Sequence, residues 1–133
     1  MSGTPWTSIL SVGIGGGLGS IARYLVGLWF VGRLPLPLPM GTFVVNILGS
    51  FIIGLVAELA LLRAFGVSPE VRLFVVVGVL GGFTTFSSLS LELTTLIRGS
   101  EWAWAFFYSA GSLVIGLAAA FGGIALAKAL ATA

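Results

Sequence analysis

Cysteine and histidine are both absent from the sequence, and charged residues make up only 8% of its 133 residues. Without cysteine there is no disulfide framework and no thiolate nucleophile. Without histidine, imidazole cannot shuttle protons or bind a metal ion. The net charge of +2 is too small and too dispersed to indicate a nucleic-acid partner. These absences exclude thiol chemistry, metal sites built on cysteine or histidine, and nucleic-acid binding.

Hydrophobic residues, in contrast, make up 58% of the chain and gather in four long runs. A run of about 20 apolar residues is long enough to cross a lipid bilayer as a helix. The 20 glycines are typical of membrane helices that approach one another closely. The predicted fold is an all-α integral membrane protein with a single domain of four transmembrane helices. The spans are expected at about residues 6–31, 40–62, 72–97 and 102–127.

The most informative stretch, GGFTTFSSLSLE at residues 81–92, lies inside the third span. Two glycines followed by paired threonines and serines make a poor helix interior. At membrane depth, irregular backbone is tolerated only where protein buries it or where it lines a cavity. We therefore expect the third helix to be broken at Gly81–Thr84, where freed carbonyl groups can coordinate a small monovalent cation. The alternative is an unbroken helix with small residues at a close-packed interface.

Two other spans each carry polar side chains on one face. Thr42, Asn46 and Ser50 recur at every fourth position of the second span, and Tyr108 and Ser112 do so in the fourth. Neutral donors and the electropositive edges of phenylalanine rings can replace the water shell of an anion without a fixed charge that traps it. The pattern favours a path for a small, hard anion, and the alternative is that these groups only join helices.

Charges are few, and their positions carry information about orientation. Arg23 falls inside the first span, so it should face a vestibule, find a partner or extend to the membrane surface. The other basic residues are nearly balanced between the two sides of the membrane: Arg63, Arg72 and Lys128 on one side, Arg33 and Arg98 on the other. This small difference is a weak orientation signal, which suggests that copies insert both ways up.

Catalysis has little support in the sequence. A serine nucleophile needs a base to activate it, and no lysine lies inside the predicted spans. Paired-carboxylate chemistry needs two acids close together, whereas Glu92 is the only carboxylate near the polar stretch. We therefore expect that the protein is not an enzyme.

Three motifs together resemble those of the Fluc (CrcB) fluoride channels: the stretch at 81–92, GTFVVNILGSFIIG at 41–54 and GIGGGLGSIARY at 13–24. The resemblance covers nearly the whole chain. It implies a channel that exports fluoride down its electrochemical gradient and so relieves fluoride toxicity. It also implies an antiparallel, dual-topology homodimer in the inner (plasma) membrane, with two pores and a central structural sodium ion.

The resemblance also implies roles for individual residues. Asn46, with Thr42 one turn before it, and Phe86 match pore positions. The backbone carbonyls of Gly81 and Thr84 would hold the sodium ion. The remaining expected pore residues are Ser88, Tyr108, Ser112 and Glu92, and Arg23 is expected near the aqueous vestibule.

Two positions depart from the family pattern, and another family offers an alternative. Leu89 stands where the family has a second phenylalanine, and Gly116 stands where its hydroxyl track continues. The alternative is a dual-topology exporter similar to the small multidrug-resistance proteins, which rely on a carboxylate inside the membrane. Glu92 could take that part, but that family's glutamate lies in the first span, where this chain has Arg23. A purely structural membrane subunit is the third possibility.

Overall fold

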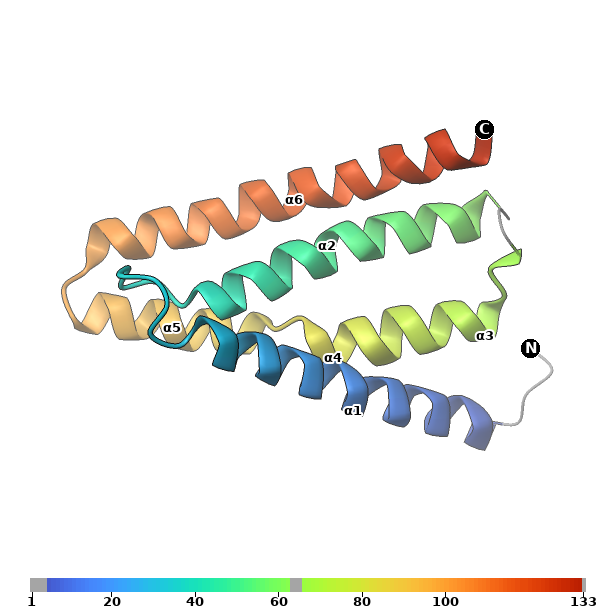
Figure 1. Ribbon diagram of the computed structural model, residues 1–133, viewed down its shortest axis with the longest axis horizontal. Helices are drawn as coiled ribbons and strands as arrows, with labels where there is room; N and C mark the ends of the chain where they lie inside the picture. The colour runs from blue at the N-terminus through green and yellow to red at the C-terminus, as the bar shows by residue number, and fades with distance from the viewer. Residues whose placement is uncertain (1–4, 63–65, 133) are drawn as a thin grey trace.

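The computed structural model describes residues 5–62 and 66–132, and within them every regular element is helical. The elements are α1 (Pro5–Phe30), α2 (Met40–Leu61), α3 (Pro69–Arg72), the π-helical segment η2 (Leu73–Leu80), α4 (Gly81–Phe83), α5 (Phe86–Arg98) and α6 (Trp102–Thr132). The segments α3 to α5 run on as the third span, which gives four spans long and apolar enough to cross a membrane (Figure 1). The expected all-α fold is confirmed, and α6 continues beyond its predicted end.

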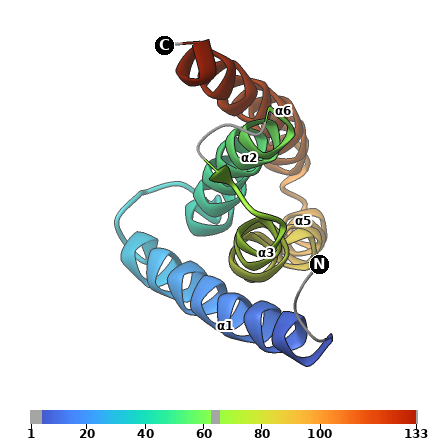
Figure 2. The ribbon, with the colours of Figure 1, turned by 90° about the vertical axis from the view of Figure 1, so that its right-hand side faces the viewer.

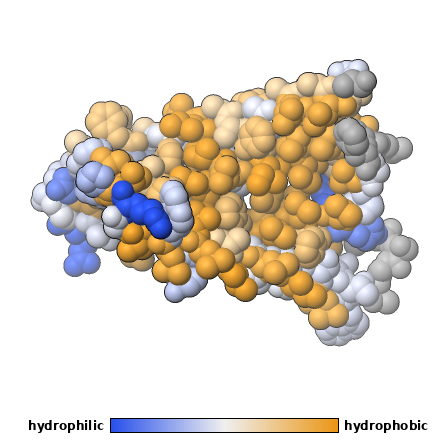
Figure 3. Space-filling view, viewed as in Figure 1, coloured by the Kyte–Doolittle hydropathy of each residue, from blue (hydrophilic) through white to orange (hydrophobic). Residues whose placement is uncertain are grey.

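The four spans run side by side along the long axis of the molecule (Figure 1). The start of α1 and the end of α6 lie at the same end, as an even number of spans requires. Hydrophobic residues cover the middle of the visible face, and hydrophilic residues gather toward its two ends (Figure 3). This arrangement fits a bilayer around the middle. Arg63, which entered the charge comparison above, lies outside the described residues.

Glycines bring α1 against the third span with almost no side chain between them. Gly15 and Gly19 are buried, and a Cβ atom at Gly19 would lie only 2.0 Å from the carbonyl oxygen of Val79. A Cβ atom at Gly82 would lie 2.2 Å from the oxygen of Gly16. Lipid tails are as apolar as the helix side chains, so hydrophobicity does not favour contact between helices over contact with lipid. Helices in lipid therefore associate through close packing of this kind. The contact holds the half of the third span that precedes its break.

We expect Gly19→Ala to weaken this contact by about 1–3 kcal/mol, because the backbone atoms that it meets cannot move aside as a side chain can. The loss should appear as a lower thermal unfolding midpoint in detergent. Gly17→Ala is the matched control, because a Cβ atom at Gly17 would meet nothing within 4 Å. Equal losses in the two variants would mean that the glycine contact is not what holds α1.

A second glycine contact joins α2 to α6. A Cβ atom at Gly54 would lie 2.2 Å from the oxygen of Ala120, and one at Gly123 would lie 2.1 Å from the oxygen of Phe51. Figure 2 shows the result along the molecule: α2 lies between α6 and the third span, and α1 flanks the third span. The helices therefore pack as interleaved pairs, the first span with the third and the second with the fourth.

The third span is interrupted as expected, but the interruption lies at the C-terminal edge of the predicted segment. Gly81–Phe83 is still helical, and the extended residues are Thr84 (φ −83°, ψ 157°) and Thr85 (φ −154°, ψ 120°). Gly82 does not break the helix, and it must be small because it packs against the backbone of α1. Gly49 of α2 leaves room for the methyl group of Thr84 at the break. A Cβ atom at Gly49 would lie 2.1 Å from that methyl carbon.

Candidate functional site

Asn46 on α2 holds the break in the third span through two hydrogen bonds to one residue. Its Nδ2 donates to the carbonyl oxygen of Thr85 at 3.0 Å, and the N–H of Thr85 donates to its Oδ1 at 2.8 Å. An amide side chain thus satisfies both polar groups of a residue that has left the helix. One N–H of the Asn46 amide remains beyond this pair. Asn46, expected to bind an anion, therefore also fixes the backbone of the break.

Thr85 begins α5 as its N-cap. Its Oγ1 accepts a hydrogen bond from the N–H of Ser88 at 3.1 Å and donates one to the hydroxyl oxygen of Ser88, also at 3.1 Å. Thr85 is not among the site residues expected from the sequence, although a threonine just before an apolar helical run is an N-cap signal. Ser88, an expected pore residue, lies in the first turn after the break.

At the break, side chains take the N–H groups that would be the helical donors of two backbone carbonyls. In a continuous α-helix the N–H of Thr85 would bond to the carbonyl of Gly81, and that of Ser88 to the carbonyl of Thr84. Both N–H groups are instead bonded to side-chain oxygens. The carbonyl of Gly82 differs, because the hydroxyl of Ser20 on α1 donates to it at 3.4 Å. The two carbonyls expected to bind a cation are therefore the ones whose helical donors have been diverted.

Glu92 joins two other expected pore residues, Thr42 and Tyr108, through hydrogen bonds. Its Oε1 accepts a hydrogen bond of 2.6 Å from Thr42 on α2, and its Oε2 accepts one of 2.7 Å from Tyr108 on α6. Tyr108 is buried, with 2% of its surface exposed. One carboxylate on α5 thus links the second and fourth spans. Hydrogen bonds to a charged acceptor are among the stronger ones, so this cluster should be well ordered.

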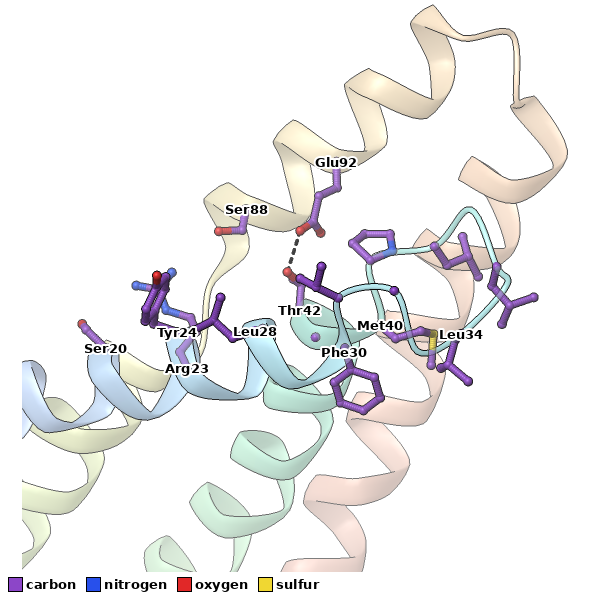
Figure 4. A pocket seen from close by; sticks show the side chains of 17 residues that line it. Ser20, Arg23, Tyr24, Leu28, Phe30, Leu34, Met40, Thr42, Ser88 and Glu92 are labelled. Carbon is purple, nitrogen blue, oxygen red and sulfur yellow. Dashed lines mark hydrogen bonds between the residues drawn. The ribbon is translucent and has the colours of Figure 1, made fainter.

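Arg23 lines a cavity of about 710 Å³. Thr42, Ser88 and Glu92 line the same cavity, and Figure 4 shows Arg23 on α1 across from the other three. The Nε of Arg23 is buried and has no hydrogen-bond partner among the described residues. The cavity combines one guanidinium group and one carboxylate with hydroxyl groups, so its donors to an anion are Arg23 and the hydroxyls. A vestibule role for Arg23 stays a prediction.

Phe86 lies on the outside of the chain, immediately beyond the break. Its side chain is 81% exposed. A second cavity, of about 350 Å³, is lined by Phe86 together with Asn46, Ser50 and Leu89. Leu89 also packs against the buried cluster that contains Tyr108. The ring and the amide expected to form the pore therefore border one cavity, which the single chain leaves open.

On α6 the expected hydroxyl track continues from Tyr108 to Ser112 and then stops. The Oγ of Ser112 is buried and has no hydrogen-bond partner among the described residues. At the next position, Gly116 faces α2, where a Cβ atom would lie 3.5 Å from the hydroxyl oxygen of Ser50. Ser50 in turn donates to the carbonyl of Asn46 at 2.7 Å. A hydroxyl from α2 thus lies beside the position where the fourth span lacks one.

The structure therefore gathers most of the expected residues between α2, α5 and α6, and it leaves Phe86 facing outward. The side chains available there are neutral donors, one carboxylate and one guanidinium group. Among the described residues, no group of three or more Asp, Glu, His or Cys side chains could hold a metal ion. The carbonyl oxygens of Gly81 and Thr84, which have lost their helical donors, are groups that can bind a small monovalent cation.

Known proteins resemble the chain over nearly all its length. The sequence model of the family described as CrcB-like protein, Camphor Resistance (CrcB), matches residues 10–124. A protein of Rhizobium meliloti (strain 1021) named "Fluoride-specific ion channel FluC" is 45% identical over 92% of this chain and 97% of its own length. Proteins of the same name from Agrobacterium fabrum and Thermus thermophilus are 50% and 52% identical, over 91% of this chain and 96% and 94% of their own lengths. The chain belongs to the CrcB-like family.

Proposed function

We propose that this multi-pass membrane protein is a fluoride channel, which lets fluoride leave the cell passively and so relieves fluoride toxicity. The observation that carries the proposal is the line of neutral donors leading from the Arg23 cavity to the break, with Ser88 in the first cavity and Asn46 in the second. Fluoride gives up its water only to close donors, and a neutral site lets it leave again. The relatives named as fluoride-specific channels support the same function.

Fluoride efflux from liposomes tests this proposal directly. Purified protein is reconstituted into vesicles loaded with potassium fluoride, and valinomycin is added to balance the charge. We expect rapid fluoride release, while parallel vesicles loaded with potassium chloride keep their chloride. Protein-free vesicles are the control. If fluoride stays inside vesicles that contain folded protein, the channel proposal is wrong.

The exporter alternative receives no support from the same observations. Both oxygens of Glu92 are held by hydroxyl groups at 2.6 and 2.7 Å, from Thr42 and Tyr108. A carboxylate that exchanges protons for a cationic drug must instead be free to meet the drug. The relatives named above are ion channels rather than exporters or enzymes.

The working unit in this proposal is an antiparallel homodimer with two pores. Phe86 and Gly81 are exposed in the single chain although they border the cavity that contains Asn46. A second copy would cover this face and complete the walls of that cavity. A dimer of oppositely oriented copies needs a chain that inserts both ways, which the nearly balanced charges allow.

We expect a tag at the C-terminus to be reached by a membrane-impermeant label from both sides of the membrane in a population of cells. Adding two arginines beside Arg33 should reverse the small bias of the population, because the count changes from three against two to three against four. Adding two glutamines at the same place is the control and should leave the distribution unchanged. If nearly every unmodified copy faces one way, the antiparallel dimer is wrong.

The dimer would hold one structural sodium ion where the two breaks meet. The residues fit such an ion, since the carbonyls of Gly81 and Thr84 have lost their helical donors and Gly81 is exposed on the face assigned to the second copy. Carbonyl oxygens at a break suit a small monovalent cation. The ion would supply a fixed positive charge that joins the two copies, and neither pore would pass through it.

A further inference from the structure

We propose that Asn46 and Thr85 are positioning residues for the sodium ion, and that they act by drawing two backbone N–H groups away from the carbonyls that bind it. The inference rests on the proposed sodium site. It concerns what creates that site, because a chain of glycines and threonines does not by itself keep carbonyls free of their helical partners.

Asn46 acts on the carbonyl of Gly81. The N–H of Thr85 is the donor that a continuous helix would give to that carbonyl, and it is bound at 2.8 Å to Oδ1 of Asn46. The return bond, 3.0 Å from Nδ2 to the carbonyl of Thr85, fixes the same residue at a second point. A two-point attachment holds Thr85 in its extended conformation, with φ −154° and ψ 120°. The carbonyl of Gly81 is thus left without the N–H of Thr85 and is available to the sodium ion.

Thr85 acts on the carbonyl of Thr84 through its own side chain. The N–H of Ser88, the helical donor for that carbonyl, is bound at 3.1 Å to Oγ1 of Thr85. The methyl group of Thr84 packs directly against Gly49, which has no side chain to block it, and this contact also helps to fix Thr84. The carbonyl of Thr84 is therefore free of its helical donor and has a fixed position.

One of the two intervening carbonyls, that of Gly82, has a donor from another helix. Gly82 lies between Gly81 and Thr84, and its carbonyl accepts the hydroxyl of Ser20 at 3.4 Å. A carbonyl that accepts a hydrogen bond is a poorer cation ligand, because the donor repels the ion and occupies part of the oxygen. Ser20 thus occupies the carbonyl of Gly82, whereas the carbonyls of Gly81 and Thr84 have lost their helical donors to the side chains of Asn46 and Thr85.

The test measures sodium binding by thermal unfolding of the purified dimer in detergent. An ion that binds only the folded protein raises the unfolding midpoint as its concentration rises. The midpoint is followed as sodium chloride replaces N-methylglucamine chloride at constant ionic strength. Thr85→Val removes the hydroxyl at constant shape, and Thr85→Ser is its matched control, which keeps the hydroxyl. Asn46→Ala removes the amide, and Ser50→Ala is its control one turn along α2.

We expect Thr85→Val and Asn46→Ala each to need at least about tenfold more sodium for the same rise in midpoint, as one redirected hydrogen bond implies. Thr85→Ser and Ser50→Ala should respond like the unmodified protein. If both test variants keep the original sodium dependence, the positioning inference is wrong while the sodium site stands. If the unmodified protein unfolds at one midpoint in both salts, the sodium site itself is wrong and the inference falls with it. If the Asn46→Ala protein is aggregated on gel filtration, the comparison of Thr85→Val with Thr85→Ser tests the inference by itself.

Discussion

Replacing Asn46 with aspartate is expected to reduce fluoride efflux from liposomes by at least about a hundredfold, because the change introduces an unpaired repulsive charge in a partly buried place. The amide has one N–H left after it binds Thr85, and in the proposed pore this N–H donates a hydrogen bond to the passing fluoride ion. Aspartate removes it and repels the ion. It also sets a carboxylate oxygen against the carbonyl of Thr85, which in the unmodified protein receives a hydrogen bond from Nδ2.

The same samples are analysed by gel filtration, because a packing defect would also abolish efflux. The glycine contacts that join α2 to α6 lie further along the two helices, at Gly54 of α2 and Gly123 of α6. We therefore expect the Asn46→Asp protein to elute as the unmodified protein does. Normal efflux from that variant would remove Asn46 from the ion pathway.

Replacing Phe86 with isoleucine is expected to reduce fluoride efflux by about tenfold, which corresponds to the loss of one favourable aromatic contact. Isoleucine keeps apolar bulk beyond the break but has no electropositive ring edge to offer an anion. Phe121→Ile is the matched control, because Phe121 lies on α6 with a similarly exposed ring, 63% against 81%, and borders neither of the two cavities. We expect that control to conduct normally.

The companion variant Leu89→Phe asks whether a second ring would help. Leu89 borders the cavity that contains Asn46 and Phe86. If ring edges carry the ion, efflux should stay equal or rise in this variant. Equal efflux in the Phe86 and Phe121 variants, both unchanged from the original, would assign Phe86 to packing alone.

The sequence was sufficient for the spans but not for the contacts between them. Long apolar runs define the helices because a bilayer imposes their length, and paired threonines after glycines indicated the interrupted third span. The break itself falls at Thr84 and Thr85, since it depends on Asn46, 39 residues away in the sequence. No local pattern reports such a partner.

The candidate site shows the same division. Tyr108 and Thr42 could be placed on polar helix faces from their spacing alone. Their meeting at Glu92 could not, because it depends on how α2, α5 and α6 pack around one another. The outward position of Phe86 is a property of the folded chain as well, which the sequence pattern does not report.

The interleaved packing of the spans has a consequence for how the chain is made. Ribosomes deliver the first two spans to the membrane before the third and fourth exist. Gly19 then has no Val79 to pack on, and Gly54 has no Ala120. A nascent chain that ends near Leu61 holds two helices whose main partners have not been synthesised. Lipid or the insertion machinery must cover the glycine surface of α1 until the third span emerges, and that of α2 until α6 does. A pause in translation between the second and third spans would leave this protein at its most vulnerable to membrane proteases.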